Sequence, residues 1–286
     1  MDVRAAISNL SATGIPLWAI GIGGGLFICL VGALVVLMRP PRARYSKAIN
    51  SFADLKRAAD EKNDAKACRE VFLMLHEGRG APRDHDAGEH YRHKAIRLYK
   101  TLARGNDPHA CMRVAELTDH GRGARPSDEA DIYYRKALTL YEPRAGRGDL
   151  DALFVLGHLY CNGLGCKQNY DTAAGYWETA AARKSVLAMK RLGALYSGPK
   201  ADAVKALKWW RAAALLDDAE AQEQMGDGYF RNLGEPSHRE EAYRWYAYAA
   251  RRGRHGVKVK LEQIEKDWTP AQLMDVQNRL KTWTPA

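Results

Sequence analysis

A short repeated segment constrains the fold of this 286-residue chain more than any other feature. An aromatic pair or Leu-Tyr, followed by small residues, begins at positions 98, 140, 176, 209 and 245, so successive copies lie 42, 36, 33 and 36 residues apart. A second, apolar segment with a turn residue recurs between them, at 72–82, 114–126, 155–167, 191–200 and 224–236. This period is typical of solenoids, whose units bury their apolar faces against their neighbours.

Each unit predicts two helices joined by a turn. In the third unit, apolar residues recur at i, i+3, i+4, i+7 and i+8, which is one face of an α-helix; they are Ala152, Val155, Leu156, Leu159 and Tyr160. Glycines on this face, at 157, 193 and 226, predict close approach of a neighbouring helix.

The turns predict where each first helix ends and each second helix begins. Gly-x-Gly pairs supply the positive φ that ends a helix; they lie at Gly78 and Gly80, Gly121 and Gly123, and Gly163 and Gly165. Four residues stand where the N-cap of the second helix belongs: Asp84, Asp128, Asn169 and Asp202.

The best-preserved unit resembles the Sel1-like repeat, whose pattern is approximately A-x-x-x-L-G-x-x-Y-x-x-G-x-G-V-x-x-D-x-x-x-A-x-x-W-Y-x-x-A-A-x-x-G. It departs from the pattern at Cys166, Asn169 and Lys184. The matching residues are Ala152, Leu156, Gly157, Tyr160, Gly163, Gly165, Ala173, Tyr176, Trp177, Ala180 and Ala181. The resemblance covers 67–253 as about five repeats. It implies an all-α superhelical solenoid of αα-hairpins whose concave groove binds protein partners.

Helical segments at both ends of the repeats are predicted to cap the solenoid. The segment 48–66 contains Phe52, Leu55 and Ala59 at helical spacing. In the segment 254–286, a closing helix is expected from Thr269, with Pro270 at its first position. Its inward residues are expected to be Leu273, Val276 and Leu280.

A membrane anchor is predicted at 15–38, after a short tail at 1–14. These 24 residues contain no charge, and a helix of this length crosses a hydrocarbon core about 30 Å thick. A cleaved signal peptide is the alternative, but it predicts a shorter apolar core and a small-x-small cleavage site. Instead, a basic, proline-containing linker comes next, at 39–47.

The charges that flank the span predict its orientation. Arg39, Arg42, Arg44 and Lys47 come directly after it, so the positive-inside rule places the repeats in the cytoplasm, with the periplasm as the alternative. The same cations are expected to attract anionic lipid. Gly21 and Gly25 form a Gly-x-x-x-Gly motif, which is a weak indication of a homodimer.

One cluster of polar residues has the composition of a metal site. The segment 76–93 contains His76, His85, His90 and His93 among four acidic residues. A transition metal, and with it a metal-dependent enzyme, is one interpretation; the other is a polar turn and a solvated start of a helix. Because no zinc spacing motif accompanies the cluster, we expect no metal, cofactor or catalytic residue.

A second candidate site surrounds the turn of the third unit. Cys161 and Cys166 flank a Gly-x-Gly, and His158 precedes them by one helical turn. Zinc and a disulfide are possible interpretations, yet both cysteines occupy turn positions of the repeat. We therefore expect a turn with free thiols in the cytoplasm, whereas a bridge between them would favour the periplasm.

The net charge of +10 suggests an anionic partner. A basic cluster at 251–260 fits nucleic acid or lipid, but such a run is usually a solvated surface. The recurring glycines precede no β-strand, so phosphate binding is not expected. The aromatic pairs at 176–177, 209–210 and 245–246 recur once per repeat, which favours packing over base stacking.

Together these features predict a protein–protein interaction scaffold, anchored in the bacterial inner membrane by one span and not an enzyme. The resemblance implies a role in assembling an envelope, secretion or signalling complex, and no specific nucleic acid is expected. A periplasm-facing component of the same fold and a metal-dependent enzyme are the alternatives.

Overall fold

The structure, a computed structural model, describes residues 52–120, 126–231 and 236–283, and every regular element among them is helical. None of these helices is both long enough and apolar enough to cross a membrane. The predicted span at 15–38, its flanking cations and the Gly21–Gly25 motif lie outside the described residues. The chain divides into two units, Met1–Ala95 and Ile96–Ala286.

The first unit contains α4 (Phe52–Glu61), α5 (Ala65–Glu77) and the beginning of α6 (His85–Arg104). Helices α4 and α5 pack against each other, and their buried residues include Ala59, Cys68 and Phe72. Tyr91 of α6 is also buried, and its hydroxyl donates a hydrogen bond to Oδ1 of Asp60 on α4 at 2.9 Å. Burial and the Asp60 carboxylate raise the pKa of Tyr91 to about 12, so this hydroxyl stays a donor at neutral pH.

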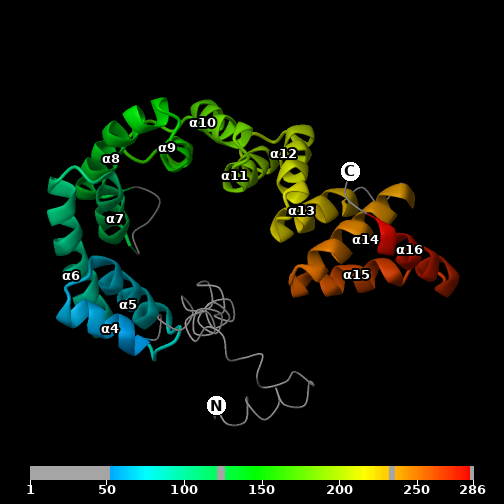
Figure 1. The fold of residues 1–286 in the computed structure, drawn as a ribbon, viewed down its shortest axis with the longest axis horizontal. Helices are drawn as coiled ribbons and strands as arrows, with labels where there is room; N and C mark the ends of the chain where they lie inside the picture. Colours follow the sequence, from blue (N-terminus) through cyan, green and yellow to red (C-terminus); the bar gives the residue numbers. More distant parts are fainter. Residues whose placement is uncertain (1–51, 121–125, 232–235, 284–286) are drawn as a thin grey trace, which may run out of the picture. The chain divides into compact units, whose positions relative to one another are not determined.

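The second unit is a row of helices in which each packs against the next (Figure 1). After the rest of α6, its helices are α7 (Pro108–Thr118), α8 (Asp128–Gly146), α9 (Leu150–Asn162), α10 (Tyr170–Ala182), α11 (Val186–Ser197), α12 (Ala203–Leu215), α13 (Ala219–Phe230) and α14 (Pro236–Arg251). Within this unit α7, α9 and α11 lie on one side of the row, called the inner side, and α8, α10 and α12 lie on the other. The predicted repeat of helical hairpins is therefore confirmed.

The two helices of a hairpin touch where the first carries a glycine. A Cβ added at Gly157 would lie 2.5 Å from Cδ1 of Trp177, closer than real Cβ contacts come. The same overlap occurs between Gly193 and Trp210, at 2.6 Å. A third copy pairs Gly226 with Tyr246 at 2.5 Å. The close approach predicted from the three glycines is confirmed, and the partner each time is the second residue of the repeated aromatic pair.

Consecutive hairpins are joined by a tight link with constant geometry. The residue before the next N-cap has a positive φ in every link, namely Asn63, Asn106, Gly148, Lys184, Asp217 and Gly253. At Lys184 the chain makes two bonds of the Schellman type, from Lys184 N to Ala181 O at 2.8 Å and from Ser185 N to Ala180 O at 3.2 Å. Side chains then cap the next helix; they are Asp64, Asp107, Asp149, Ser185 and Asp218.

Three of the four predicted N-caps of the second helices accept backbone hydrogen bonds as expected: Asp84, Asn169 and Asp202. The prediction of Asp128 is wrong, because Ser127 is the N-cap of α8 and its hydroxyl accepts from Ala130 N at 3.2 Å. Asp128 begins the helix instead, where a carboxylate favours the positive end of the helix dipole.

The predicted left-handed glycines are found at four positions, Gly78, Gly80, Gly163 and Gly165. Gly165 also faces its neighbouring repeat closely, since an added Cβ would lie 2.6 Å from the backbone nitrogen of Arg135. Gly121 and Gly123 lie outside the described residues.

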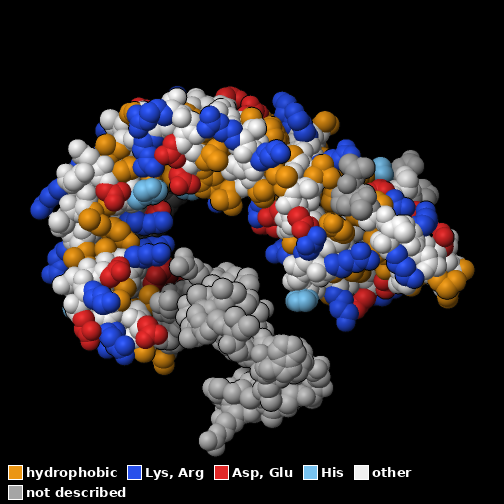
Figure 2. All heavy atoms as spheres, in the orientation of Figure 1, with side chains coloured by type: hydrophobic (Ala, Val, Ile, Leu, Met, Phe, Trp, Pro, Cys, Tyr) orange, Lys and Arg blue, Asp and Glu red, His pale blue; other side chains and the backbone are white. Residues whose placement is uncertain are grey.

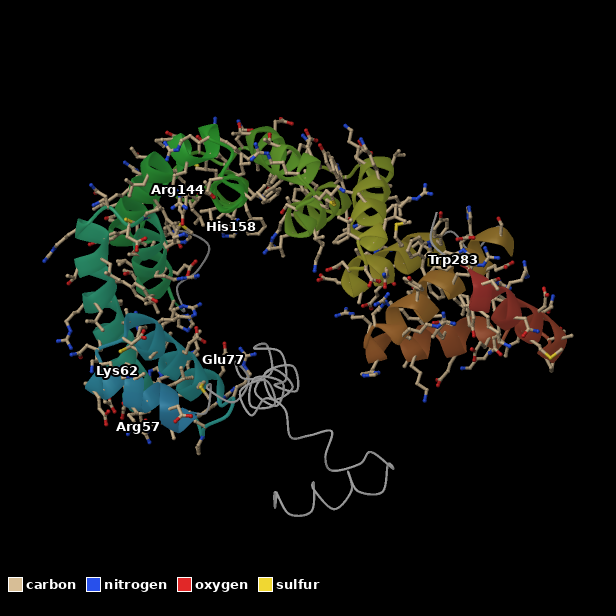
Figure 3. The ribbon with its side chains drawn as sticks, viewed as in Figure 1. Arg57, Lys62, Glu77, Arg144, His158 and Trp283 are labelled. Carbon is tan, nitrogen blue, oxygen red and sulfur yellow. The ribbon has the colours of Figure 1, made fainter. Side chains whose placement is uncertain are left out.

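The last described helices, α15 (Lys258–Glu265) and α16 (Pro270–Thr282), pack with α14 around a shared apolar cluster. Thr269 and Gln272 form a capping box at the start of α16. Val276 and Leu280 are buried in the cluster, and Leu273 packs against it. Trp283, labelled in Figure 3, meets Trp245 edge to face with ring centroids 5.3 Å apart.

The contact between Gly157 and Trp177 makes a direct stability prediction. Gly157→Ala should lower the free energy of unfolding by about 1–3 kcal/mol, because the added methyl group forces the indole away from α9. The control is Gly175→Ala in α10, where an added Cβ meets nothing within 4 Å. That change should be neutral or stabilising by up to about 1 kcal/mol. Urea denaturation of the full chain, followed by circular dichroism, measures both, and equal effects would contradict the packing described here.

Candidate functional site

Most charges on the inner side of the second unit are paired within the protein. On α7, Arg113 Nη1 lies 2.6 Å from Glu116 Oε2. On α11, Lys190 Nζ lies 3.3 Å from Asp218 Oδ2 and also contacts Glu220. Such pairs neutralise one another, so they leave little charge to attract a ligand.

The carboxylates of α13 are paired as well. Lys260 Nζ lies 3.1 Å from Glu223 Oε1 and 2.6 Å from Asp227 Oδ1, and Arg254 Nε lies 2.7 Å from Glu223 Oε2. Burial raises the pKa of Glu223, but the hydrogen bonds from Arg254 and Lys260 outweigh it, so its pKa lies below the usual value. This network joins the last repeat to the closing segment.

Between these paired groups, α9 and α11 form a different surface. Phe154 and His158 are four residues apart on α9, and Leu187 and Arg191 are four residues apart on α11, so each pair shares a helix face. The two pairs meet where the guanidinium carbon of Arg191 lies 5.8 Å from the centroid of the Phe154 ring. Leu187 is 61% exposed. We call these four residues the α9–α11 patch.

Arg191 gives the α9–α11 patch its charge. It is exposed, and among the residues that the structure describes no carboxylate lies within ion-pairing distance of it. Its guanidinium instead lies over an aromatic face, where cation–π attraction holds it without neutralising it. The cation therefore remains available to a ligand.

The surroundings of His158 change the pKa of its imidazole. Figure 3 shows it on the inner side, beside α9. Burial and the positive charge of Arg191 lower the pKa of His158, while Glu116 opposes them. Its Nδ1 lies 3.1 Å from Asn162 Nδ2. The ring is therefore neutral at physiological pH and adds polar but uncharged surface to the patch.

Apolar side chains surround these polar groups. Figure 2 shows hydrophobic side chains gathered over α11 on the inner side, with Lys and Arg beside them. Val155 is half-buried, and Ala194, three residues after Arg191, is small and exposed. The patch thus combines the available cation of Arg191 with apolar area, and the small side chain of Ala194 beside it leaves room for another chain.

The histidines at 76–93 do not form a shared site. The rings of His76 and His85 are 6.3 Å apart, while His93 Nδ1 lies 2.8 Å from the carbonyl oxygen of Glu89. The Glu89 carboxylate is held by Arg92, and this hydrogen bond lowers the pKa of Glu89. In the described part of the chain, no three His, Cys, Asp or Glu side chains are arranged to hold a metal ion.

Cys166 lies in the turn of the third unit, as expected, but the prediction of a turn position for Cys161 is wrong, because α9 extends to Asn162 and holds Cys161 in its last turn. Both are half-buried and unbridged, and burial raises the pKa of each thiol. Cys166 Sγ lies 3.8 Å from Leu159 O, whereas the carbonyl of Cys161 accepts a hydrogen bond from Gln168 Nε2 at 2.8 Å. These contacts hold the turn together.

The other predicted features have structural roles among the described residues. The second member of each aromatic pair is buried against a glycine: Trp177, Trp210 and Tyr246. Several cations of the 251–260 cluster are ion-paired, since Arg252 Nη1 lies 2.7 Å from Asp217 Oδ2, in addition to the contacts of Arg254 and Lys260. The cluster is therefore partly neutralised by its own chain.

Two open clefts lie between neighbouring repeats. One, of about 720 Å³, is lined by residues of the 166–171 turn and by Pro199 and Lys200, and an ion pair between Lys200 and Asp171 crosses it. The other, of about 350 Å³, lies between Tyr196, Trp210 and Gly228. Both result from the stacking of the repeats, and neither brings together residues with a recognisable chemistry.

The sequence predicted a groove for protein partners but not the residues of the α9–α11 patch. Phe154, His158 and Arg191 occupy variable positions of the repeat, where the pattern demands no residue type. The available signal was the i, i+4 spacing of a polar and an apolar residue at these positions in two successive repeats. This spacing indicates a binding surface only once it is known which variable positions of neighbouring repeats lie side by side.

Comparison with known proteins finds similarity over most of the described chain. A family model described as Sel1 repeat matches residues 65–107, 108–142, 150–185, 186–218 and 219–253. A Sel1 repeat protein from Oxalobacter formigenes is 29% identical over 70% of this chain and 78% of that chain, with a TM-score of 0.41. No curated protein matches.

Two further solved structures are similar to parts of this chain. One is a protective antigen present in uropathogenic Escherichia coli strains and displaying an SLR fold, at 22% identity over 80% of this chain and 55% of that chain, with a TM-score of 0.38. The other is an immunity protein from Pseudomonas aeruginosa, at 17% identity over 74% of this chain and 82% of that chain, with a TM-score of 0.43.

The electrostatics of the patch can be measured at His158. Arg191→Gln should raise the pKa of His158, because it removes a nearby positive charge, and Glu116→Gln should lower it further. Imidazole NMR resonances of the full chain, followed between about pH 4 and 8, report both shifts. In the folded protein the pKa of His158 lies below the ordinary 6.5, so the unfolded chain takes up the proton first as the pH falls. The stability that the neutral His158 contributes is therefore present above about pH 6.5 and is lost as the pH falls below it. Shifts in the opposite directions would contradict this geometry.

Proposed function

The chain belongs to the Sel1 repeat family, and we propose that it is a membrane-anchored scaffold that binds protein partners on the inner side of its solenoid. Sel1-repeat solenoids are typically protein–protein interaction scaffolds, not catalysts. Stacked helical hairpins suit this role, because each repeat adds a similar pair of helices while its variable positions carry different side chains.

The observation that supports the proposal most is the contrast between the first helices of successive hairpins. Charges of α7 and α13 are neutralised by ion pairs within the chain, such as that of Glu116 with Arg113 and that of Asp227 with Lys260. The α9–α11 patch instead exposes Leu187 beside the cation of Arg191. Exposed apolar area with a polar rim is the composition expected of a binding surface.

Anchoring is proposed from the sequence. The uncharged segment 15–38 is long enough to cross a bilayer, and the cations at Arg39, Arg42, Arg44 and Lys47 favour the cytoplasmic side for the repeats. We propose an inner-membrane protein that assembles an envelope, secretion or signalling complex.

Site-directed photo-crosslinking in intact cells tests the scaffold. A benzophenone amino acid replaces Leu187 in the full chain, and the control replaces Val204 on α12, which is 80% exposed. We expect discrete cross-linked protein products from position 187 and much weaker ones from 204. Products from 204 alone, or equal products from both positions, would show that the inner side is not the partner surface.

The proposed orientation is tested separately with reporters fused after Ala286. A fluorescent protein that folds in the cytoplasm should be active, and alkaline phosphatase should be inactive, because the positive-inside rule places this end in the cytoplasm. Fractionation should recover the full chain with membranes and a chain lacking 1–38 in the soluble fraction. Active phosphatase would instead place the repeats in the periplasm.

A further inference from the structure

The α9–α11 patch has a more specific chemistry than a general protein-binding surface. We propose that it binds a peptide segment in which a carboxylate side chain lies beside one or two apolar side chains, the carboxylate on Arg191 and the apolar groups on Leu187 and Phe154. This inference rests on the proposed scaffold function and names the class of partner.

Arg191 is suited to receive a carboxylate. A guanidinium carries five N–H donors in a planar fork that matches both carboxylate oxygens. The ring of Phe154, 5.8 Å away, covers one side of the group. Because the aromatic ring cannot accept its in-plane hydrogen bonds, the donors at the edge of the guanidinium remain free for a ligand. The Phe154 ring also shields the guanidinium and a bound carboxylate from water, which strengthens the attraction between these two groups.

The apolar part of the segment has a matching surface. Leu187 lies one helical turn before Arg191 on α11 and is 61% exposed. Phe154 of α9, whose ring contacts Arg191, is half-buried and adds aromatic area beside the guanidinium. A Leu, Ile or Phe placed next to the bound carboxylate therefore covers aliphatic and aromatic area, and removing that area from water stabilises the complex.

The surroundings of the patch favour a single carboxylate over a polyanion. A nucleic acid or an anionic membrane presents several regularly spaced phosphates, which need several available cations. The patch offers Arg191, whereas the nearby cations Arg113, Lys190 and Lys260 are paired with carboxylates of the chain. One carboxylate flanked by apolar groups meets only the cation.

Peptide selection on the purified full chain tests the proposal. A displayed library of random twelve-residue peptides is selected, and the recovered peptides are synthesised for fluorescence polarisation. We expect Asp or Glu next to Leu, Ile or Phe. Arg191→Glu and Leu187→Asp should each weaken binding about tenfold or more, because the first replaces the partner of the carboxylate with a like charge and the second removes apolar contact area.

Two controls separate recognition from folding. Lys208→Glu, which reverses an exposed cation on α12, should leave the affinity within about twofold, since it lies outside the patch. A peptide whose acidic residue is changed to Lys should regain affinity for the Arg191→Glu protein, because the charges are exchanged. Circular dichroism melting of each variant confirms that it is folded.

The outcomes distinguish this inference from the scaffold function beneath it. Peptides that lack an acidic residue, or that bind Arg191→Glu and Leu187→Asp as well as the unchanged protein, overturn the assignment of the patch. The same is true if no peptide is recovered. The scaffold function itself fails if position 187 gives no cross-linked partner in cells, or gives no more than position 204.

Discussion

The contact between a glycine on the first helix of a hairpin and an aromatic ring on the second is the interaction on which the rest of the structure depends. Without a side chain at Gly157, the ring of Trp177 lies directly on the backbone of α9. Its indole N–H donates to Phe154 O at 3.1 Å, so the buried ring is also satisfied as a donor. The contact thus fixes both the separation and the register of the two helices.

The same arrangement recurs with different polar partners. Trp210 Nε1 donates to Ser197 Oγ at 3.1 Å, and Tyr246 Oη donates to Asp227 Oδ1 at 2.6 Å. Since the packing solution is constant, the remaining positions of the first helices are free to differ. The residue two places after the repeat alanine is Phe154, Lys190 or Glu223 in successive repeats. One fold therefore presents apolar, basic and acidic positions in turn on the first helices of successive hairpins.

Much of the fold could be predicted because it depends on residues close in sequence. The helical hairpins, the close-packed glycines and the left-handed turns are consequences of spacing and backbone preference. Ser127 was missed as an N-cap because the adjacent Asp128 is an equally good capping residue. Which of the two residues becomes the N-cap depends on where the preceding turn ends.

The candidate site could not be predicted in the same way. The repeat pattern identifies positions that are buried, but the contact of Arg191 with Phe154 joins variable positions 37 residues apart in sequence and on neighbouring repeats. The histidines at 76–93 illustrate the converse. They are close in sequence, yet one is hydrogen-bonded to its own helix at Glu89 O, and they do not converge on one point.

Hydrogen–deuterium exchange of the full chain, with and without a bound acidic and apolar peptide, tests most directly whether function resides on the inner side. Binding should slow amide exchange in α9 and α11, whose side chains form the patch, because a ligand there stabilises these helices against local opening. Exchange in the solvent-facing parts of α10 and α12 should change much less. Slowing confined to α10 and α12, with α9 and α11 unaffected, would contradict the account.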